Sequence, residues 1–577
     1  MKKLMLGNEA VARGAYEAGV KVAVAYPGTP STEITEFIAQ YDDIYAEWSP
    51  NEKVALEVGI GSSIGGARTI VSMKHVGVNV AADPLFTVSY TGVNGGLVIM
   101  TADDPGMHSS QNEQDSRFYA KAAHIPMLEP SDSQETKDFV KIAFELSEKY
   151  DTPVFVRLTT RISHSQSLVE TSEKVDVPLK EYSKDVMKYV MMPGMARKRH
   201  VIVEEKINRL ADDASNLSIN SVETNDTKIG FITSGIPYQY VKDVFPNASI
   251  LKLGMVHPLP KELIEKFCDS VEKVYVIEEL EPIIEEQIKS WGIKVEGKDL
   301  LTKQGEYSAN LLLNKLEDKE LNFAKAEILP QRPPVLCAGC PHRSIYYSLK
   351  KLKKHATGDI GCYTLGAIPP LSGLDTCVDM GASIGMLHGL EKANGKEFVK
   401  DWVAIIGDST FVHSGITGLV DIVYNKGAST VMILDNSTTG MTGHQDNPAT
   451  GVTLKGEKTK VLNLVSLCKS IGIERVRVVN PFDPKDVEKA ITEETEVLEP
   501  SVIIASAPCR LLDKKTVPIP NYIDVEKCKD CGMCLKLGCP CIKKANGTMV
   551  IDDTLCVGCS LCEDVCKFGA IGKVGGK

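Results

Sequence analysis

Short apolar runs alternate with helix-like segments along most of the chain. In the first part, segment 20–41 has the pattern strand, turn, helix, and segments 67–75, 95–104 and 152–160 have the β-branched apolar pattern of buried strands. Strands that alternate with helices predict a parallel sheet covered by helices on both faces. Each of these strands leads into a polar loop, which is where such sheets bind their ligands.

The same pattern returns twice. A polar, charged stretch separates the first region from the second, and consecutive prolines after Gln331 separate the second from the third. The final segment has short elements and many cysteines, so we expect metal to hold it together. The predicted segments are an α/β domain at 1–171, a connector at 172–227, a second α/β domain at 228–318, a third at 331–517 and a small domain at 518–577.

Composition narrows the class of protein. Hydrophobic residues make up 43% and charged residues 24%, as in globular proteins, and the net charge of −11 without a basic stripe argues against nucleic acid. No run reaches the roughly 18–20 apolar residues of a membrane span, and the first residues lack the apolar core of a signal peptide. We therefore expect a cytoplasmic protein without membrane attachment, in which the 16 cysteines serve metals or redox chemistry.

Nine cysteines follow Asn521, eight of them in two regular runs. The runs are C-x2-C-x2-C-x4-C-P and C-x2-C-x2-C-x3-C, and they resemble bacterial two-cluster ferredoxins, in which the fourth cysteine of each run binds the other cluster. Two features depart from that pattern. There is one extra residue before Cys539, and Lys567 stands where a proline is usual. A pair of zinc sites is the alternative, and Cys541 is either a bystander or an alternative ligand. The resemblance implies one [4Fe–4S] cluster on Cys528, Cys531, Cys534 and Cys566, and another on Cys539, Cys556, Cys559 and Cys562.

Two strand ends of the third region carry oxygen ligands. The apolar run 402–407 ends in Gly407-Asp408, and the next strand ends in Asp435-Asn436. Mg²⁺ prefers such oxygen ligands, and the pattern resembles the thiamine diphosphate motif. That resemblance implies the Asp408 carboxylate, the Asn436 side chain and the Thr438 carbonyl as metal ligands. It implies a cofactor-binding set of Gly381, Gly407, Asp408, Ser409, Asn436, Thr438, Gly440 and Thr442.

Two segments of the first region resemble the pyrimidine side of the same cofactor site. Pro50-Asn51-Glu52 resembles the segment whose glutamate protonates the aminopyrimidine ring, a role suited to a buried carboxyl. Its alternative is a solvated glutamate that opens a helix. The turn Tyr26-Pro27-Gly28-Thr29-Pro30-Ser31 resembles one in which the threonine lies beside substrate and cofactor, and a helix N-cap is its alternative. The resemblance thus implies Glu52 and Thr29 as catalytic residues.

A further cysteine group lies in the third region. Cys337-x2-Cys340, with Cys362 and Cys509, has the order of the ligands of a cofactor-proximal [4Fe–4S] cluster. The C-x2-C pair alone is equally typical of zinc or of a redox dithiol. Cys377 and Cys468 do not match, and we expect them to be core thiols.

In this order the motifs resemble the thiamine diphosphate-dependent 2-oxoacid:ferredoxin oxidoreductases, and among them the alpha subunits of the indolepyruvate branch. The resemblance implies two thiamine diphosphate-binding parallel-sheet domains, a transketolase-C-terminal-like α/β domain and a C-terminal two-cluster ferredoxin domain. It implies thiamine diphosphate, Mg²⁺, three [4Fe–4S] clusters and coenzyme A as co-substrate. A smaller beta subunit, a soluble ferredoxin and an arylpyruvate are the implied partners.

The substrate site departs from pyruvate-specific relatives. Those relatives bind the substrate carboxylate with an arginine that follows the strand ending here in Asp103, and an aspartate cannot do so. His108, Gln111, Arg117 and Arg161 are the candidate donors, and a changed site fits a bulkier, aromatic acid. The alternatives are another 2-oxoacid oxidoreductase, a non-redox thiamine diphosphate decarboxylase, and an electron-transfer subunit with a vestigial thiamine site.

Overall fold

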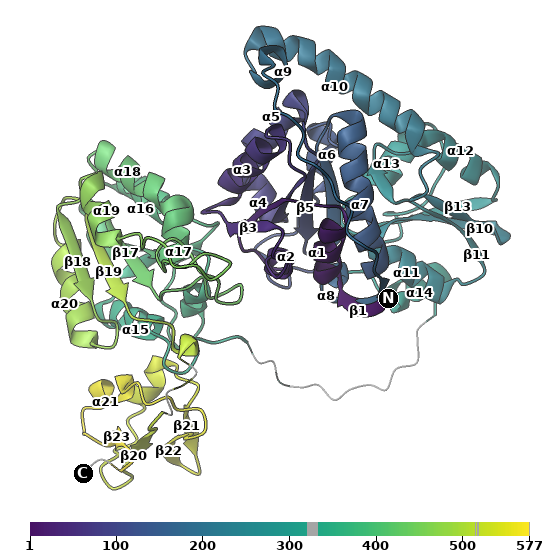
Figure 1. The fold of residues 1–577 in the computed structure, drawn as a ribbon. Coiled ribbons are helices and arrows are strands. Elements are labelled where there is room, and N and C mark those ends of the chain that lie inside the picture. The colour runs from purple at the N-terminus through teal and green to yellow at the C-terminus, as the bar shows by residue number, and fades with distance from the viewer. Residues whose placement is uncertain (320–329, 331–332, 514, 516–517, 576–577) are drawn as a thin grey trace. The chain divides into compact units, whose positions relative to one another are not determined.

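The structure is a computed structural model (Figure 1) that describes residues 1–319, 330, 333–513, 515 and 518–575. The chain divides into two compact units, Met1–Lys325 and Ala326–Lys577, and each is described by itself. The predicted boundaries at Gln331 and at residue 517 lie outside the described residues. Within the described part, no helix combines the length and apolarity needed to cross a bilayer.

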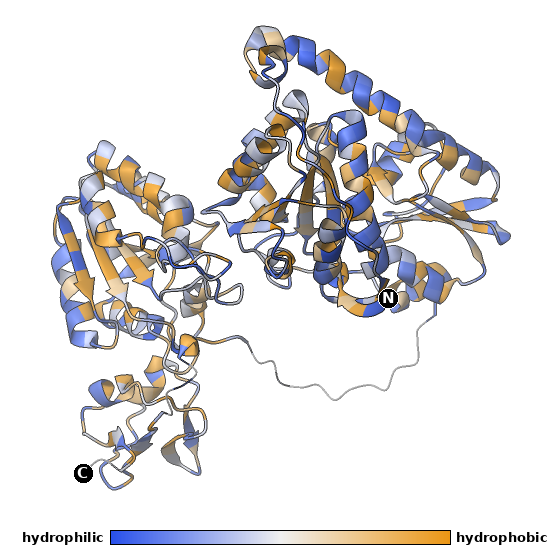
Figure 2. Cartoon of the chain, in the orientation of Figure 1, coloured by the Kyte–Doolittle hydropathy of each residue, from blue (hydrophilic) through white to orange (hydrophobic). Residues whose placement is uncertain are grey.

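The first unit is built on a seven-stranded sheet in the order β12-β6-β7-β5-β4-β2-β3. All its strands are parallel except β12, which pairs antiparallel with β6. Figure 2 shows these strands as mainly hydrophobic, as a sheet with both faces covered requires. The strands are β2 (Val22–Ala25), β3 (Tyr45–Trp48), β4 (Thr69–Lys74), β5 (Leu97–Asp103), β6 (Met127–Leu128), β7 (Val154–Thr159) and β12 (Met255–His257). The helices are α1 (Gly7–Glu17), α2 (Thr32–Ile38), α3 (Glu52–Ile64), α4 (His75–Val80), α5 (Ala82–Thr91), α6 (Arg117–Ala122), α7 (Ser133–Tyr150) and α8 (Thr160–His164).

A four-stranded sheet in the order β13-β10-β11-β9 completes this unit. One hydrophobic cluster contains Val71 and Ile99 of the large sheet together with Ile232 and Val276 of the small one, so the two sheets share a core. The strands are β9 (Ser221–Glu223), β10 (Asp226–Thr233), β11 (Ala248–Lys252) and β13 (Lys273–Ile277). The helices are α11 (Gly235–Val244), α12 (Lys261–Asp269), α13 (Ile283–Ser290) and α14 (Ala309–Glu317).

The predicted connector holds more structure than its polarity indicates. It contains α9 (Val186–Tyr189), the long helix α10 (Pro193–Ala214) and strand β9. α10 crosses the unit (Figure 1), buries Val203 and Leu210, and donates a hydrogen bond from Arg199 to the Tyr90 carbonyl at 2.6 Å. Upstream, β8 (Gln166–Glu170) pairs with the N-terminal strand β1 (Lys2–Leu6). Most of this segment is therefore part of the first unit.

The second unit contains a six-stranded parallel sheet in the order β15-β14-β16-β17-β19-β18. Successive residues of its central strands enter opposite cores: Ile405 packs in one cluster and Ile406 in the other. The apolar runs are therefore continuous rather than alternating. The strands are β14 (His355–Gly358), β15 (Thr376–Cys377), β16 (Trp402–Gly407), β17 (Thr430–Asp435), β18 (Arg475–Val479) and β19 (Ser501–Ser506). The helices are α15 (His342–Leu352), α16 (Ala382–Asn394), α17 (Asp408–Thr410), α18 (Ile416–Tyr424), α19 (Leu464–Ile471) and α20 (Pro484–Thr495).

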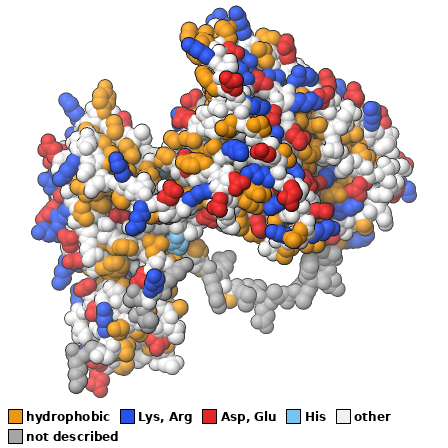
Figure 3. All heavy atoms as spheres, viewed as in Figure 1, with side chains coloured by type: hydrophobic (Ala, Val, Ile, Leu, Met, Phe, Trp, Pro, Cys, Tyr) orange, Lys and Arg blue, Asp and Glu red, His pale blue; other side chains and the backbone are white. Residues whose placement is uncertain are grey.

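The C-terminal part of this unit has two small antiparallel pairs around a core that includes cysteines. The elements are β20 (Asn521–Ile523), β21 (Ile542–Ala545), β22 (Thr548–Ile551), α21 (Leu561–Val565) and β23 (Ile571–Lys573). On the face drawn in Figure 3, cationic and anionic side chains are interspersed, and no large patch of one sign stands out. This agrees with the charge pattern of the sequence.

Candidate cofactor and iron–sulfur sites

Three oxygen atoms meet at the carboxyl edge of the six-stranded sheet. Asp408 directly follows β16, and Asn436 directly follows β17. The side-chain oxygen of Asn436 lies 3.3 Å from Asp408 Oδ1 and 2.7 Å from the Thr438 carbonyl oxygen, while its amide nitrogen lies 3.4 Å from His342 Nε2. If the Asn436 amide were turned over, its nitrogen would donate to both Asp408 Oδ1 and the Thr438 carbonyl. That orientation is the one to expect when no cation lies between the oxygens. As oriented, these are the three oxygen atoms that the sequence motif predicts.

The charge of Asp408 needs a counter-charge. Its Oδ2 atom is buried and has no hydrogen-bond partner among the described residues. Burial and the nearby Asp435 raise the pKa of Asp408 to about 7. A divalent cation at this point would satisfy the orphaned oxygen and restore the ionised carboxylate. The residues present thus fit the predicted metal.

The remaining predicted cofactor residues surround this point. Gly381 caps α16 in the left-handed region (φ +94°), and its N–H donates to the Asp359 carboxylate at 2.8 Å. Gly440 is close to both predicted centres, because a Cβ there would lie 3.3 Å from Cys362 Sγ and 3.6 Å from Asn436 Nδ2. Two hydroxyls already have protein partners: Ser409 accepts from Thr439 at 2.9 Å and Thr442 donates to Gln445 at 2.5 Å.

The four cysteines predicted for a proximal cluster lie in one group. Cys337 interacts electrostatically with each of the other three, Cys340, Cys362 and Cys509. Burial raises the pKa of Cys340 to about 12 and that of Cys362 to about 11. Such thiols ionise only when a metal replaces their protons. The other two thiols differ: Cys468 is buried in the core as expected, whereas Cys377 is exposed, so its prediction as a core thiol is wrong. Cys377 ends the edge strand β15, where only one side of the strand is covered.

The ferredoxin-like part contains two small cavities, and each is lined by one of the predicted sets of four cysteines. The first cavity is lined by Cys528, Cys531, Cys534 and Cys566. The second is lined by Cys539, Cys556, Cys559 and Cys562, and also by Cys541. Gly538, in the left-handed region (φ +63°), directly precedes Cys539. The grouping of the cysteines around the two cavities agrees with the sets that the ferredoxin resemblance implies, and it also places Cys541 at the second cavity.

Two contacts join the proximal group to the second cavity. Arg343 is buried and donates to the Leu537 carbonyl and to the Cys337 carbonyl, both at 2.9 Å. Gly339, between two proximal cysteines, is so close to the second ferredoxin run that a Cβ would lie 2.3 Å from Val557 Cγ2. Ala338 and Gly339 line the second cavity. The second cavity is therefore next to the proximal group.

Glu52 and Thr29 lie at the carboxyl edge of the seven-stranded sheet. Glu52 opens α3 but is only 4% exposed, so it is not the solvated glutamate of the alternative prediction. Its carboxylate packs on Gly77, where a Cβ would lie 2.6 Å from Oε1. Thr29 is not a helix cap, because α2 is capped by Ser31, and its carbonyl accepts from Ser109 Oγ at 3.1 Å.

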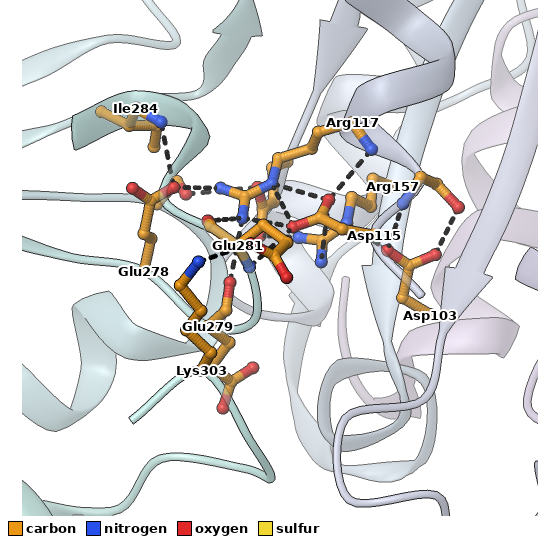
Figure 4. Close-up of polar contacts among 12 residues, drawn as sticks. Asp103, Asp115, Arg117, Arg157, Glu278, Glu279, Glu281, Ile284 and Lys303 are labelled. Carbon is orange, nitrogen blue, oxygen red and sulfur yellow. Dashed lines mark hydrogen bonds and ion pairs between the residues drawn. The ribbon is translucent and has the colours of Figure 1, made fainter. Parts of the chain in front are cut away.

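Arg117 is not available to a substrate. Figure 4 shows its guanidinium enclosed by acidic side chains and carbonyl groups. It is 1% exposed and donates to Asp115 and Glu278, both at 2.6 Å, and to the carbonyls of Glu279 and Glu281 at 2.9 Å. We therefore no longer regard Arg117 as a substrate donor.

Asp103, at the strand end where the resemblance led us to look for a substrate-binding arginine, is also enclosed. Asp103 is buried, and its carboxylate accepts hydrogen bonds from Arg157 Nε at 2.7 Å and from Ser116 Oγ at 2.5 Å. The other candidates are exposed: His108 and Arg161 both contact the Glu306 carboxylate, at 3.1 and 2.6 Å, and Gln111 lies on the same loop as His108. A substrate carboxylate on His108 or Arg161 would have to compete with Glu306.

Known families match the chain in the same order. The thiamine pyrophosphate enzyme C-terminal TPP-binding domain matches residues 359–505, the thiamine diphosphate-binding domain of pyruvate flavodoxin/ferredoxin oxidoreductase matches 13–226, and a 4Fe-4S binding domain matches 549–572. These ranges contain the converging oxygens, Glu52 with Thr29, and the second ferredoxin cysteine run respectively.

Curated relatives span nearly the whole chain. Indolepyruvate oxidoreductase subunit IorA of Archaeoglobus fulgidus is 40% identical, covering 99% of this chain and 97% of the relative, and that of Pyrococcus horikoshii is 40% identical with the same coverage. A solved 2-oxoglutarate:ferredoxin oxidoreductase from Magnetococcus marinus superposes with a TM-score of 0.47 at 17% identity, over 55% of this chain and 65% of that one. The chain therefore belongs to the family of indolepyruvate oxidoreductase subunits IorA, an oxidoreductase family with thiamine pyrophosphate and 4Fe-4S domains.

Proposed function

We propose that this chain is the thiamine diphosphate- and cluster-bearing subunit of a cytoplasmic arylpyruvate:ferredoxin oxidoreductase. The observation that carries the proposal is the convergence of the Asp408, Asn436 and Thr438 oxygens beside the proximal cysteine Cys362. A cofactor held by a cation at this edge would lie close to an electron acceptor. That pairing serves oxidative decarboxylation and has no use in a non-redox decarboxylase.

The overall reaction balances as a two-electron oxidation. One 2-oxoacid, one coenzyme A thiol and two oxidised ferredoxins give one acyl-coenzyme A, one CO2, one proton and two reduced ferredoxins. Thiamine diphosphate, when bound, supplies the electron sink for the loss of CO2. Indolepyruvate, phenylpyruvate and hydroxyphenylpyruvate are the proposed substrates, and the names of the curated relatives support the first.

This chain's own residues do the binding and positioning. Asp408, Asn436 and the Thr438 carbonyl would hold Mg²⁺, and the contact of the Asn436 amide nitrogen with His342 keeps the Asn436 oxygen on the side of Asp408 and Thr438. Gly381, Gly407, Ser409, Gly440 and Thr442 form the surrounding cradle for the diphosphate. His108 and Gln111, on an exposed loop, and Arg161, exposed on α8, would be the groups near an entering substrate.

Electrons leave through the second unit in a fixed order. Cys337, Cys340, Cys362 and Cys509 would hold the first cluster to accept electrons, and Cys539, Cys556, Cys559 and Cys562, beside Gly339, would hold the second. Cys528, Cys531, Cys534 and Cys566 would hold the last cluster, from which single electrons would pass to a soluble ferredoxin. A smaller beta subunit completes the enzyme.

The two thiols at the second cavity give a matched pair of variants. We expect Cys539→Ser to remove or distort one of the two ferredoxin-type clusters, whereas Cys541→Ser leaves both in place. The reason is that Cys539 is the fourth cysteine of the first run and is followed by Pro540, as is the cysteine that binds the other cluster in two-cluster ferredoxins. Electron paramagnetic resonance of the dithionite-reduced protein, with iron per chain, measures this. Loss of a cluster signal in Cys541→Ser alone would make Cys541 the ligand.

Glu52 is proposed as the carboxyl that exchanges a proton with the aminopyrimidine of the cofactor. We expect Glu52→Gln to lower kcat by about 10²–10⁴-fold, the range for a general acid–base group. Binding of thiamine diphosphate, followed by isothermal titration, should change little. Glu57→Gln is the control, because Glu57 lies on the same helix and pairs with Lys53 at the surface. A Glu52 variant with wild-type kcat would remove the residue from catalysis.

The proposed function is tested on the chain co-expressed with its partner subunit and purified without oxygen. Ferredoxin reduction is measured with indolepyruvate, phenylpyruvate, pyruvate and 2-oxoglutarate, with and without coenzyme A. Reduction confined to the aryl acids and dependent on coenzyme A is expected. Ferredoxin reduction only with pyruvate or 2-oxoglutarate would show that the proposed substrate class is wrong. Decarboxylation without ferredoxin reduction would show that the proposed redox role is wrong.

A further inference from the structure

A buried lysine lies at the carboxyl edge of the seven-stranded sheet, between the two catalytic segments. Lys74 is the last residue of β4, and β4 lies between β2, which leads to the Thr29 turn, and β5, which ends in Asp103. The lysine is 7% exposed. A 2-oxoacid carries one carboxylate, and two buried arginines of this region, Arg117 and Arg157, are enclosed by acidic groups. Lys74 is a cation in the same region without such an enclosure.

Contacts tie Lys74 to the proposed substrate side of the site. Its Nζ donates to the Ser109 carbonyl at 2.7 Å, and Ser109 Oγ donates to the Thr29 carbonyl at 3.1 Å. A Cβ on Gly28 would lie 3.1 Å from Lys74 Cβ, so the lysine stem packs directly under the Thr29 turn. Lys74, Thr29 and Ser109 thus form one contact set.

The hydrogen-bonding capacity of Lys74 is not used up. An ammonium has three donors, and among the described residues the Nζ has one acceptor and no ion pair within 4.0 Å. Asp104 attracts it at longer range but accepts instead from Ser109, Ser110 and Thr160. Glu52 also attracts it, which places the ammonium near the proposed proton-exchanging carboxyl. A buried cation with donors to spare is stabilised by an anion that brings its own acceptors.

We propose that Lys74 binds the carboxylate of the 2-oxoacid substrate. This inference rests on the proposed function and names the residue that replaces the arginine of pyruvate-specific relatives. The position of that arginine is held by Asp103, whose charge is neutralised by Arg157, and the cation has moved to the neighbouring strand end. His108 and Arg161 both contact the Glu306 carboxylate, whereas the Lys74 ammonium does not.

The test uses the complete enzyme with Lys74→Met and Lys74→Arg. We expect Lys74→Met to raise KM for the aryl 2-oxoacid by roughly 10–100-fold, the range for a lost hydrogen bond to a charged group. Lys74→Arg, which keeps the charge, should recover part of the loss. Lys298→Met is the matched control, because burial also lowers the pKa of Lys298, as of Lys74, to about 8. Its partners are the Glu278 and Thr302 carbonyls and the Tyr307 hydroxyl, away from the Thr29 turn.

Two readouts separate carboxylate binding from a merely structural role. Arylpyruvate methyl ester lacks the carboxylate and cannot release CO2, so it is used as a competitive inhibitor. Lys74→Met should weaken binding of the acid but leave the inhibition constant of the ester unchanged. Binding of 3-phenylpropionate, measured by isothermal titration on the loaded enzyme, should weaken by the same factor. If Lys74 only supports the 104–110 loop, Lys74→Met would weaken the binding of the acid and of the ester by the same factor. That result would overturn the proposal. Unchanged KM would do so too, whereas a wild-type enzyme inactive on every 2-oxoacid would instead refute the proposed function.

Discussion

Asp408→Ala is expected to abolish thiamine diphosphate binding while leaving the cofactor-free protein at least as stable as the wild type. Removing a metal ligand should weaken metal-dependent cofactor binding by more than the 10–100-fold that changes behind a ligand typically cost. The stability effect has the opposite sign, because Asp408 Oδ2 is buried without a partner among the described residues. Replacing an unsatisfied buried carboxyl removes a desolvation penalty.

The measurement is isothermal titration of thiamine diphosphate in the presence of Mg²⁺, together with Tm with and without the cofactor. Wild-type protein should gain stability from the bound cofactor, and Asp408→Ala should not. Asp421→Ala is the control, since that side chain is exposed on α18. A variant that lost Tm without cofactor, or that bound the cofactor normally, would contradict the assignment of Asp408 as a metal ligand.

Local patterns predicted the parts of this protein that short sequence segments determine. The strands of the second unit were predictable because residues such as Ile405 and Ile406 enter opposite cores, which makes the runs continuously apolar. The two cysteine sets were predictable from the resemblance to two-cluster ferredoxins, in which the clusters fix the spacing of their ligands. The converging oxygens follow from parallel topology, which brings the ends of β16 and β17 to one edge.

Long-range pairing set the limit of the prediction. Nothing near Arg117 in sequence shows that it will meet Glu278, which is 161 residues away, so it resembled any arginine on a polar loop. Lys74 was missed for a related reason. It ends a strand whose neighbours in the sheet are β2 and β5, and the strand order, not the sequence, places it beside Thr29. The packing of α10 likewise depends on a distant partner. Its Arg199 donates to the carbonyl of Tyr90 in α5, which lies 109 residues earlier in the chain.

Arg117→Met is expected to cost the first unit about 3–5 kcal/mol of stability, the range for breaking a buried ion pair from one side. Methionine fills a similar volume but removes the guanidinium that contacts the buried carboxylates of Asp115 and Glu278 at 2.6 Å, and leaves Asp115 only the more distant Arg157 at 3.9 Å. Arg117 begins α6, and Glu278 follows β13, so the variant also loosens the contact between the two sheets of this unit. The exposed Arg209→Met should change stability by less than about 1 kcal/mol.

Tryptophan fluorescence can follow the first unit alone. The chain has three tryptophans, Trp48, Trp291 and Trp402, and only Trp402 belongs to the second unit. In a Trp402→Phe background, the urea midpoint therefore reports the first unit and avoids the mixed transitions of a multidomain chain. Adding Asp115→Asn and Glu278→Gln to Arg117→Met should restore part of the stability, because neutral side chains cost less to bury unpaired than carboxylates do. A midpoint unchanged by Arg117→Met would mean that solvent reaches this network and screens it, and the network would then not hold the two sheets together.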